Sequence, residues 1–224
     1  MNLRVEAHLW SREINNILAA GISYGKNNLG GGAAVNIEFV SANPTGPLHA
    51  AHARGAVIGD ALAGLLTFCG WKITREYYIN DAGGQVDTLA RSAYLRYCEA
   101  LGQDIGQIPA GLYPGLYLQE VAAQLVDEFG NRFLDKPEDE WLAPIRTFAI
   151  DAIMLGIKKD LLDLGIKMDQ FSSERDLVNS GAVQHAIDRL QNDGHLYQGV
   201  LQPPKGREPD DWEPREQLLF RASA

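Results

Sequence analysis

Apolar and polar residues alternate along this chain with the period of a strand in some stretches and of a helix in others. Residues 35–39 alternate at every second position and predict a strand. Residues 49–68 have helical spacing, and Gly70 marks the expected end of that helix. Residues 71–80 carry the aromatic and β-branched side chains of a second strand. Strand, helix and strand within about 45 residues predict a βαβ unit with a parallel sheet and a right-handed crossover.

The predicted unit also suggests where a ligand binds. The first strand has an apolar face and a polar face, formed respectively by Ile37 and Phe39 and by Asn36 and Glu38. The apolar positions of the helix include Val57, Leu62, Leu65 and Leu66. Ligands of parallel sheets bind beyond the carboxyl ends of the strands. We therefore expect residues 43–52 and 80–85 to lie together at a binding site.

Most of the remaining sequence predicts helices. Helical spacing of apolar residues covers 9–18, 86–97, 121–129, 140–164 and 181–192. We expect a short strand at 195–201 and a polar, proline-rich loop at 202–216. Residues 21–32 include three consecutive glycines that no Lys-Ser or Lys-Thr pair follows, so a flexible link between domains is favoured over a phosphate cradle.

Composition narrows the class of protein. A chain of 224 residues with 46% hydrophobic content can bury a core, as one large domain or two small ones. Neither a membrane span of roughly 20 apolar residues nor the apolar core of a signal peptide is evident, and the two cysteines are far apart. These features indicate a cytoplasmic protein. The net charge of −9 argues against a surface built for nonspecific nucleic-acid binding but does not exclude a local basic patch that contacts a particular nucleic acid.

Two histidines open the first predicted helix. His49 and His52 are three residues apart, so both rings project from one face of the first turn. Beside a bound nucleotide they could donate hydrogen bonds to phosphate oxygens, and such donors typically contribute roughly 3–4 kcal/mol to a transition state. The rigid turn at residues 43–47, with two prolines, fixes the position of the helix N-terminus. The alternatives are two solvated polar residues, or a zinc site, which no nearby cysteine or further histidine supports.

The segment from Ser41 to His52, SANPTGPLHAAH, resembles the HIGH signature of class I aminoacyl-tRNA synthetases in its arginine-specific version. Further matches to arginyl-tRNA synthetases occur in the order of that family, at 76–83, 113–115, 211–212 and 215–220. The resemblance implies an α/β fold, namely the N-terminal half of a Rossmann-like (HUP-like) class I synthetase catalytic domain with a mainly helical insertion. The implied divisions are 1–33, the end of a preceding domain and a linker; 34–85, the first half of the nucleotide-binding fold; and 86–224, the insertion and the start of the return to the catalytic fold.

The resemblance also implies a two-step reaction. ATP, with Mg²⁺, activates the carboxylate of L-arginine as an adenylate, and the aminoacyl group passes to the 3′ end of the arginine tRNA. No tightly bound protein metal and no membrane partner are expected. His49 and His52 match the catalytic signature histidines. The implied ATP-binding region comprises Pro44, Thr45, Gly46, Pro47, Leu48, His49, Ala50, Ala51, His52, Ala53 and Arg54.

The same resemblance places Glu38, Ser41 and Asn43 around the amino-acid pocket. Glu174 matches an acidic residue that holds the substrate guanidinium, whose planar shape suits a bidentate carboxylate. The alternatives are that Glu174 pairs with Arg175 or belongs to a helix capped from Ser173.

Two departures from the family pattern limit the prediction. Ala51 replaces the usual glycine of the signature, and its methyl group is expected to weaken ATP binding. The lysine signature, the anticodon-binding domain and the second half of the nucleotide-binding fold are absent from the sequence. We therefore expect a fragment that does not charge tRNA alone, and whose uncovered sheet edge and apolar surface favour self-association through the exposed half-sheet or contact with a partner. The alternatives are a degenerate, noncatalytic paralogue that acts as a binding or assembly module, and a nucleotidyl transferase that shares the two histidines.

Overall fold

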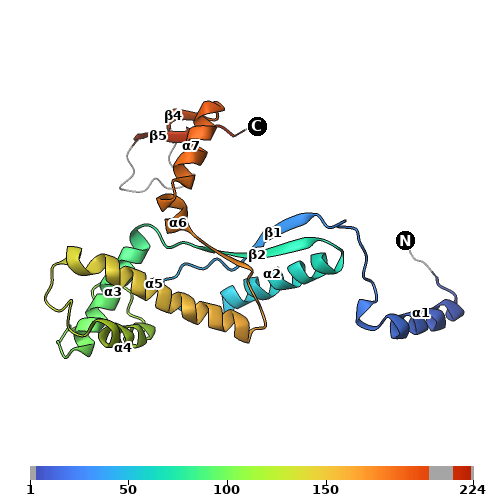
Figure 1. Cartoon of the computed structure of the whole chain (residues 1–224), viewed down its shortest axis with the longest axis horizontal. Helices are drawn as coiled ribbons and strands as arrows, with labels where there is room; N and C mark the ends of the chain where they lie inside the picture. Colours follow the sequence, from blue (N-terminus) through green and yellow to red (C-terminus); the bar gives the residue numbers. More distant parts are fainter. Residues whose placement is uncertain (1–3, 202–213, 223–224) are drawn as a thin grey trace. The chain divides into compact units, whose positions relative to one another are not determined.

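The computed structural model describes residues 4–201 and 214–222. The chain forms two compact units, Met1–Ser172 and Ser173–Ala224 (Figure 1). The predicted divisions after residues 33 and 85 are not tested by these two units and stay a prediction. The elements follow one another as α1 (Ala7–Ala20), the 3₁₀ turn η1 (Gly21–Ser23), β1 (Ala34–Glu38), α2 (Ala50–Phe68), β2 (Lys72–Ile79), α3 (Gly84–Ala100), α4 (Tyr117–Phe129), α5 (Glu138–Asp163), β3 (Gln170–Ser173), α6 (Glu174–Asn179), α7 (Ala182–Asn192), β4 (Leu196–Val200) and β5 (Glu216–Phe220).

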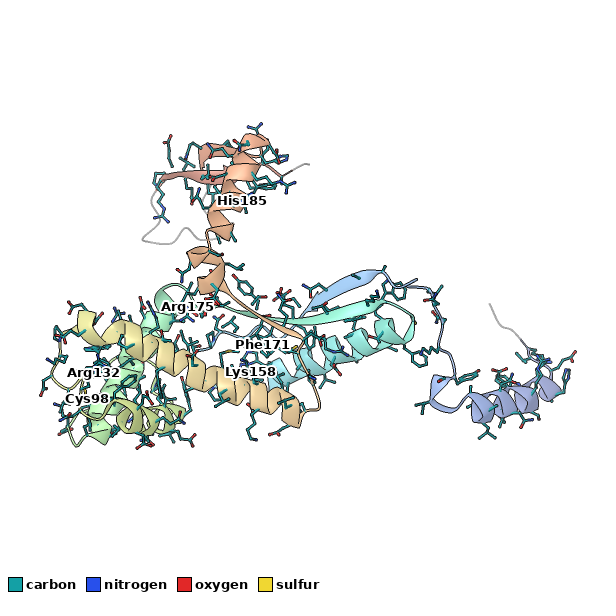
Figure 2. The ribbon with its side chains drawn as sticks, in the orientation of Figure 1. Cys98, Arg132, Lys158, Phe171, Arg175 and His185 are labelled. Atoms are coloured by element: carbon teal, nitrogen blue, oxygen red, sulfur yellow. The ribbon has the colours of Figure 1, made fainter. Side chains whose placement is uncertain are left out.

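The predicted βαβ unit is confirmed. β1 and β2 pair in parallel, with Ala34 opposite Lys72 and Glu38 opposite Glu76. The sheet also contains β3, which the sequence did not predict, in the order β1-β2-β3. Phe171 of β3 lies against Tyr77 of β2, with ring centroids 5.5 Å apart, and under the ammonium group of Lys158 of α5 (Figure 2). Through these contacts the third strand joins the sheet to the helical part of the first unit.

The helix α2 buries its small residues and exposes its large ones. Its buried positions are Ala56, Gly59 and Ala63. A Cβ atom at Gly59 would lie closer than 3.0 Å to the Phe39 ring, so the helix backbone packs directly on the end of β1. Leu65, one of the apolar positions noted in the sequence, is 65% exposed. The large apolar residues of α2 therefore do not form its contact with the sheet, contrary to what their helical spacing would ordinarily indicate.

The glycine run before β1 is not the flexible link that was favoured. The Gly30 N–H donates to the Cys69 carbonyl at 2.9 Å, and the Gly32 N–H donates to the Gly70 carbonyl at 2.8 Å. Gly30 is buried, and a Cβ atom there would lie closer than 3.0 Å to Trp71. Glycine is required at position 30 because the backbone passes directly against Trp71, and Gly31 and Gly32 have positive φ angles of 54° and 78°, which favour glycine.

The helices α3, α4 and α5 pack on one another and hold most of the buried apolar side chains of the first unit (Figure 1). Tyr94 of α3 stacks on Trp141 of α5, with ring centroids 3.8 Å apart. The Tyr97 hydroxyl donates to the Gly130 carbonyl at the end of α4, at 2.6 Å. The helical periodicity of the sequence predicted all three helices, and the structure confirms them.

Within residues 173–201 and 214–222, the second unit contains two helices and a two-stranded antiparallel sheet. β4 and β5 pair with Leu196 opposite Phe220 and Val200 opposite Glu216. The strand predicted at 195–201 and the helix predicted at 181–192 are confirmed, α6 is the helix from Ser173 that was considered as an alternative, and β5 was not predicted. The family match at Asp211 and Trp212, and most of the predicted loop at 202–216, fall outside the described residues.

Candidate functional site

The chain reverses sharply where β1 ends. Val40 and Ser41 have positive φ angles of 69° and 39°, a region that a β-branched residue such as valine seldom adopts. Two contacts from β2 hold this conformation. The Tyr77 hydroxyl donates to the Ala42 carbonyl at 2.9 Å, and the Tyr78 N–H donates to the Ser41 hydroxyl oxygen at 3.0 Å. Such backbone strain is maintained only where surrounding contacts over-determine it, as they do at many ligand sites.

A chain of side-chain amides joins the carboxyl ends of the two parallel strands. The Asn80 amide donates to the Asn43 side-chain oxygen at 3.1 Å, and the Asn43 amide donates to the Gln85 side-chain oxygen at 2.8 Å. Residues 43–52 and 80–85 were expected to meet here, and these bonds confirm it. Asn43 is exposed, so it connects the two loops while one of its amide hydrogens stays available.

The turn that follows leads directly into α2. Pro44 is buried, and the Thr45 N–H donates to the Asn43 carbonyl at 2.7 Å. The Tyr117 hydroxyl, from the start of α4, donates to the Thr45 carbonyl. The tyrosine ring also lies against Gly46, where a Cβ atom would stand 3.4 Å from it. The turn is thus held from two directions, by the sheet and by the helical layer.

The two histidines stand at the first turn of α2. His49 is the last residue before the helix, and the rings of His49 and His52 are stacked with centroids 3.7 Å apart and planes 19° apart. The His49 N–H donates to His52 Nδ1 at 3.4 Å. Because Nδ1 accepts this bond, the neutral ring of His52 carries its proton on Nε2 and offers that N–H to a ligand.

Burial lowers the pKa of His52, and the neighbouring His49 lowers it further. His52 is therefore neutral at pH 7 and acts as a hydrogen-bond donor rather than as a cation. Arg54 and Ala51 are exposed in the same first turn, next to backbone N–H groups that helical bonding leaves free. A helix N-terminus with two imidazoles suits a phosphate group.

Of the residues predicted to hold arginine, Glu38 ends β1 and is exposed on the polar face of the sheet. Its neighbour across the register, Glu76, accepts hydrogen bonds from Asn36 of β1 and Ser172 of β3. These bonds lower the pKa of Glu76, with Ser172 the larger cause. The polar face of the sheet therefore carries a carboxylate of β2, Glu76, that is bound by side chains of β1 and β3, and a second carboxylate, Glu38, beside it.

Glu174 lies in the second unit, as the first residue of α6. The Ser173 hydroxyl oxygen accepts a hydrogen bond from the Asp176 N–H at 3.1 Å, so the helix cap considered for this serine is present. The helix accounts for the local conformation of Glu174, and its role in binding a guanidinium group stays a prediction.

The sequence did not single out three residues that shape this site. Tyr77 lay within the matched segment 76–83, and Gln85 lay at the end of the expected site segment 80–85, but neither was given a role. Tyr117 stands next to the matched segment 113–115, which was the only signal that could have drawn attention to it. All three act through contacts between segments that are at least 35 residues apart in the sequence.

Over residues 4–201 and 214–222, no group of three or more His, Cys, Asp or Glu side chains is arranged to hold a metal ion. In the same residues no helix is both long enough and apolar enough to cross a membrane. Cys69 and Cys98 are both free thiols.

Comparisons with known proteins agree with this architecture. Residues 13–105 match the model of the catalytic domain of class I tRNA synthetases of the arginine type (R). The whole chain is 53% identical to an arginine–tRNA ligase of Ruegeria sp. strain TM1040 and 52% identical to that of Agrobacterium fabrum, and in each case it spans 38% of the relative's length. A solved structure described as an arginyl-tRNA synthetase of Campylobacter jejuni superposes with a TM-score of 0.75 at 31% identity, over 87% of this chain and 42% of that one.

The predicted fold class is thereby confirmed, since a parallel sheet with helices in the class I synthetase arrangement is present in both the family model and the solved structure. The motif, the βαβ unit and the comparisons agree: over its full length the chain is similar to arginyl-tRNA synthetases of class I, and it spans 38% of the length of these relatives.

Proposed function

We propose that this chain supplies the ATP-binding and arginine-binding half-site of an arginine–tRNA ligase, working in the cytoplasm. One observation carries the proposal: the stacked pair His49 and His52 opens α2 immediately after a strained turn that both the sheet and the helical layer fix in place. The residues Pro44–Arg54 contact ATP, which arrives with Mg²⁺ as part of the substrate.

The chemistry of the site suits adenylate formation. An oxygen of the arginine carboxylate attacks the α-phosphorus of ATP, a new P–O bond forms, and pyrophosphate leaves with the electrons of the broken P–O bond. The Nε2–H of His52, the second ring and the free N–H groups of α2 donate to phosphate oxygens as charge builds on them. Donors that are already in position need no rearrangement during the reaction. A firmly held turn keeps the donors of this site in position.

The arginine side of the site uses the donors that the scaffold leaves free. Ser41 accepts from β2 and retains its hydroxyl proton, and Asn43 retains one amide hydrogen, so both can donate to the substrate carboxylate. Glu38 supplies negative charge for the substrate's ammonium group. Transfer to tRNA is proposed for the complete ligase rather than for this chain alone.

Measurements of ATP binding and of arginyl-tRNA formation test this proposal. Isothermal titration of ATP into the purified chain is expected to show binding that His49→Ala and His52→Ala each weaken at least tenfold, with His185→Ala, an exposed histidine of the second unit, as the matched control. Equal effects of all three substitutions would contradict the nucleotide site.

The same preparations, given arginine, ATP and tRNA, are expected to form no arginyl-tRNA. Charging by the chain when it is free of full-length enzyme would show that the half-site is sufficient. Binding of ATP or arginine without adenylate formation, even when the rest of the ligase is supplied, would favour the noncatalytic binding module, to which Ala51 also points.

A further inference from the structure

The helical layer reaches the proposed nucleotide site through one side chain. Tyr117 begins α4, and its hydroxyl donates to the Thr45 carbonyl, 72 residues earlier in the chain. Its ring packs on Gly46, in the middle of the turn. We propose that Tyr117 is a positioning residue: it holds the turn at Thr45 and Gly46, and thereby sets where His49 and His52 stand. That the ligand is ATP rests on the proposed function. That Tyr117 positions the turn rests only on the contacts described above.

Tyr117 can hold the turn because its own segment is fixed. The Tyr113 N–H donates to the Ser92 hydroxyl oxygen at 2.9 Å, and Arg96 donates to the Pro114 carbonyl at 3.3 Å. Both partners belong to α3, the centre of the helical layer. Gly115 completes the arrangement, since a Cβ atom there would lie closer than 3.0 Å to the Tyr117 ring. The matched segment 113–115 therefore directs Tyr117 toward the turn.

On the side of the helical layer, the space beside the turn is not filled by side chains. On one side Pro47 and Tyr117 face an open hollow of about 150 Å³, which also borders Val121, Ile153 and Ile157. No side chain fills that hollow, so the hydroxyl bond and the contact with Gly46 hold the turn on this side. Loss of the hydroxyl is expected to loosen the turn without leaving a cavity in the core.

The test compares two tyrosine hydroxyls. Tyr117→Phe removes the bond to the turn and keeps the ring. Tyr94→Phe is the matched control, because the Tyr94 hydroxyl also donates to a backbone carbonyl, that of Phe133 at 3.1 Å, away from the turn. Two quantities are measured in each variant of the chain: the Kd for ATP by calorimetry, and the pKa of His52 by NMR titration. In an active ligase that contains the chain, the KM for ATP and the KM for arginine are compared as well.

In the Tyr117→Phe variant we expect the Kd and KM for ATP to rise about fivefold, the value expected for one lost hydrogen bond. The KM for arginine should change less, and the His52 pKa should rise toward its ordinary value as water reaches the ring. Tyr94→Phe should leave all of these unchanged.

If Tyr117→Phe also leaves the ATP affinity and the His52 pKa unchanged, the positioning role is wrong. If the unsubstituted chain binds no ATP while the His52 pKa still follows Tyr117, the proposed function fails and the positioning role stands.

Discussion

Three polar residues at the carboxyl end of the sheet each use one atom to hold the backbone and keep another for a ligand. The Ser41 oxygen, the Asn43 amide and His52 Nδ1 are bound within the chain, while a hydroxyl proton, an amide hydrogen and an Nε2–H remain. Because the internal bonds fix the orientation of each group, the remaining donors are aimed before a substrate arrives.

Ala51 provides a test at the scale of one methyl group. It is exposed in the first turn of α2, between the two histidines, where the family signature usually has glycine. We expect Ala51→Gly to tighten ATP binding, because removing the methyl group lets the base lie against the helix backbone. The change should also lower the stability of the helix by about 0.5–1 kcal/mol. Calorimetric Kd values and thermal unfolding of both proteins check this, and equal Kd values would rule it out.

Protonation of Glu76 is expected to lower the free energy of unfolding at acidic pH. Hydrogen bonds from Ser172 and Asn36 lower its folded-state pKa below the ordinary value of 4.5. The unfolded chain therefore takes up the proton first as the pH falls, and the stabilisation, which is complete above the unfolded pKa, is lost as the pH drops through the folded pKa. We expect the free energy of unfolding to fall between about pH 5 and pH 3. Urea titrations should show a shallower fall for Glu76→Gln, and parallel curves for the two proteins would contradict the assignment.

At the scale of one helix, α2 depends on close contact with the sheet. Gly59→Ala places a methyl group against the Phe39 ring, and overpacking of this kind costs about 1–3 kcal/mol. Gly64→Ala is the matched control, since no atom lies within 4 Å of the added Cβ there. That change should be neutral or stabilising by up to about 1 kcal/mol. Thermal or urea unfolding distinguishes the two, and a control that is as unstable as Gly59→Ala would show that steric contact is not the cause.

The elements that the sequence predicted are those with long, regular periodicity. The helices α3, α4 and α5 repeat apolar residues over three turns or more, and the strand pattern of β1 and β2 is bounded by turn residues. The strand β3 has only four residues, and β5 follows the proline-rich segment, so neither has a pattern of its own. Their positions depend on partners far away in the chain, such as the Arg75 carbonyl that accepts from the Asp169 N–H just before β3.

The sequence analysis named residues of the candidate site but not the contacts that hold them in place. The motif predicted that His49 and His52 share one face of a first turn, and the structure confirms it. The holding contacts from Tyr77, Gln85 and Tyr117 could not be read from sequence spacing, because each joins segments that only the fold brings together. The same reasoning failed at Gly30 and Gly32, where composition suggested flexibility, whereas Gly30 packs on Trp71 and the Gly32 N–H donates to the Gly70 carbonyl.

At the scale of the whole molecule, the exposed apolar side chains on the outer face of α2 (Ile58, Leu62 and Leu65) favour association of the chain with another surface. These side chains are 63%, 47% and 65% exposed. An apolar patch that stays in water favours contact with another surface, and we expect the isolated chain to self-associate through it. The double variant Ile58→Lys with Leu65→Glu should sediment as a monomer without losing thermal stability.

The matched control changes two exposed leucines on α5 with the same spacing, Leu155→Lys with Leu162→Glu, and should associate as the unsubstituted chain does. Sedimentation velocity at several concentrations measures both variants. A chain that is already monomeric at tens of micromolar, or a control that dissociates equally, would show that the α2 face is not the interface.

The packing of α2 has a consequence for how its mutations would rank in a selection. In a saturation library across residues 50–68, the buried positions Ala56, Gly59 and Ala63 would tolerate the fewest replacements. The leucine, isoleucine and valine positions on the outer face would accept polar residues readily whenever folding of the isolated chain is what is scored. A selection for the activity of a complete ligase would restrict those same positions if another part of that ligase covers them. The difference between the two libraries would therefore map, residue by residue, the surface that α2 presents to the rest of the enzyme.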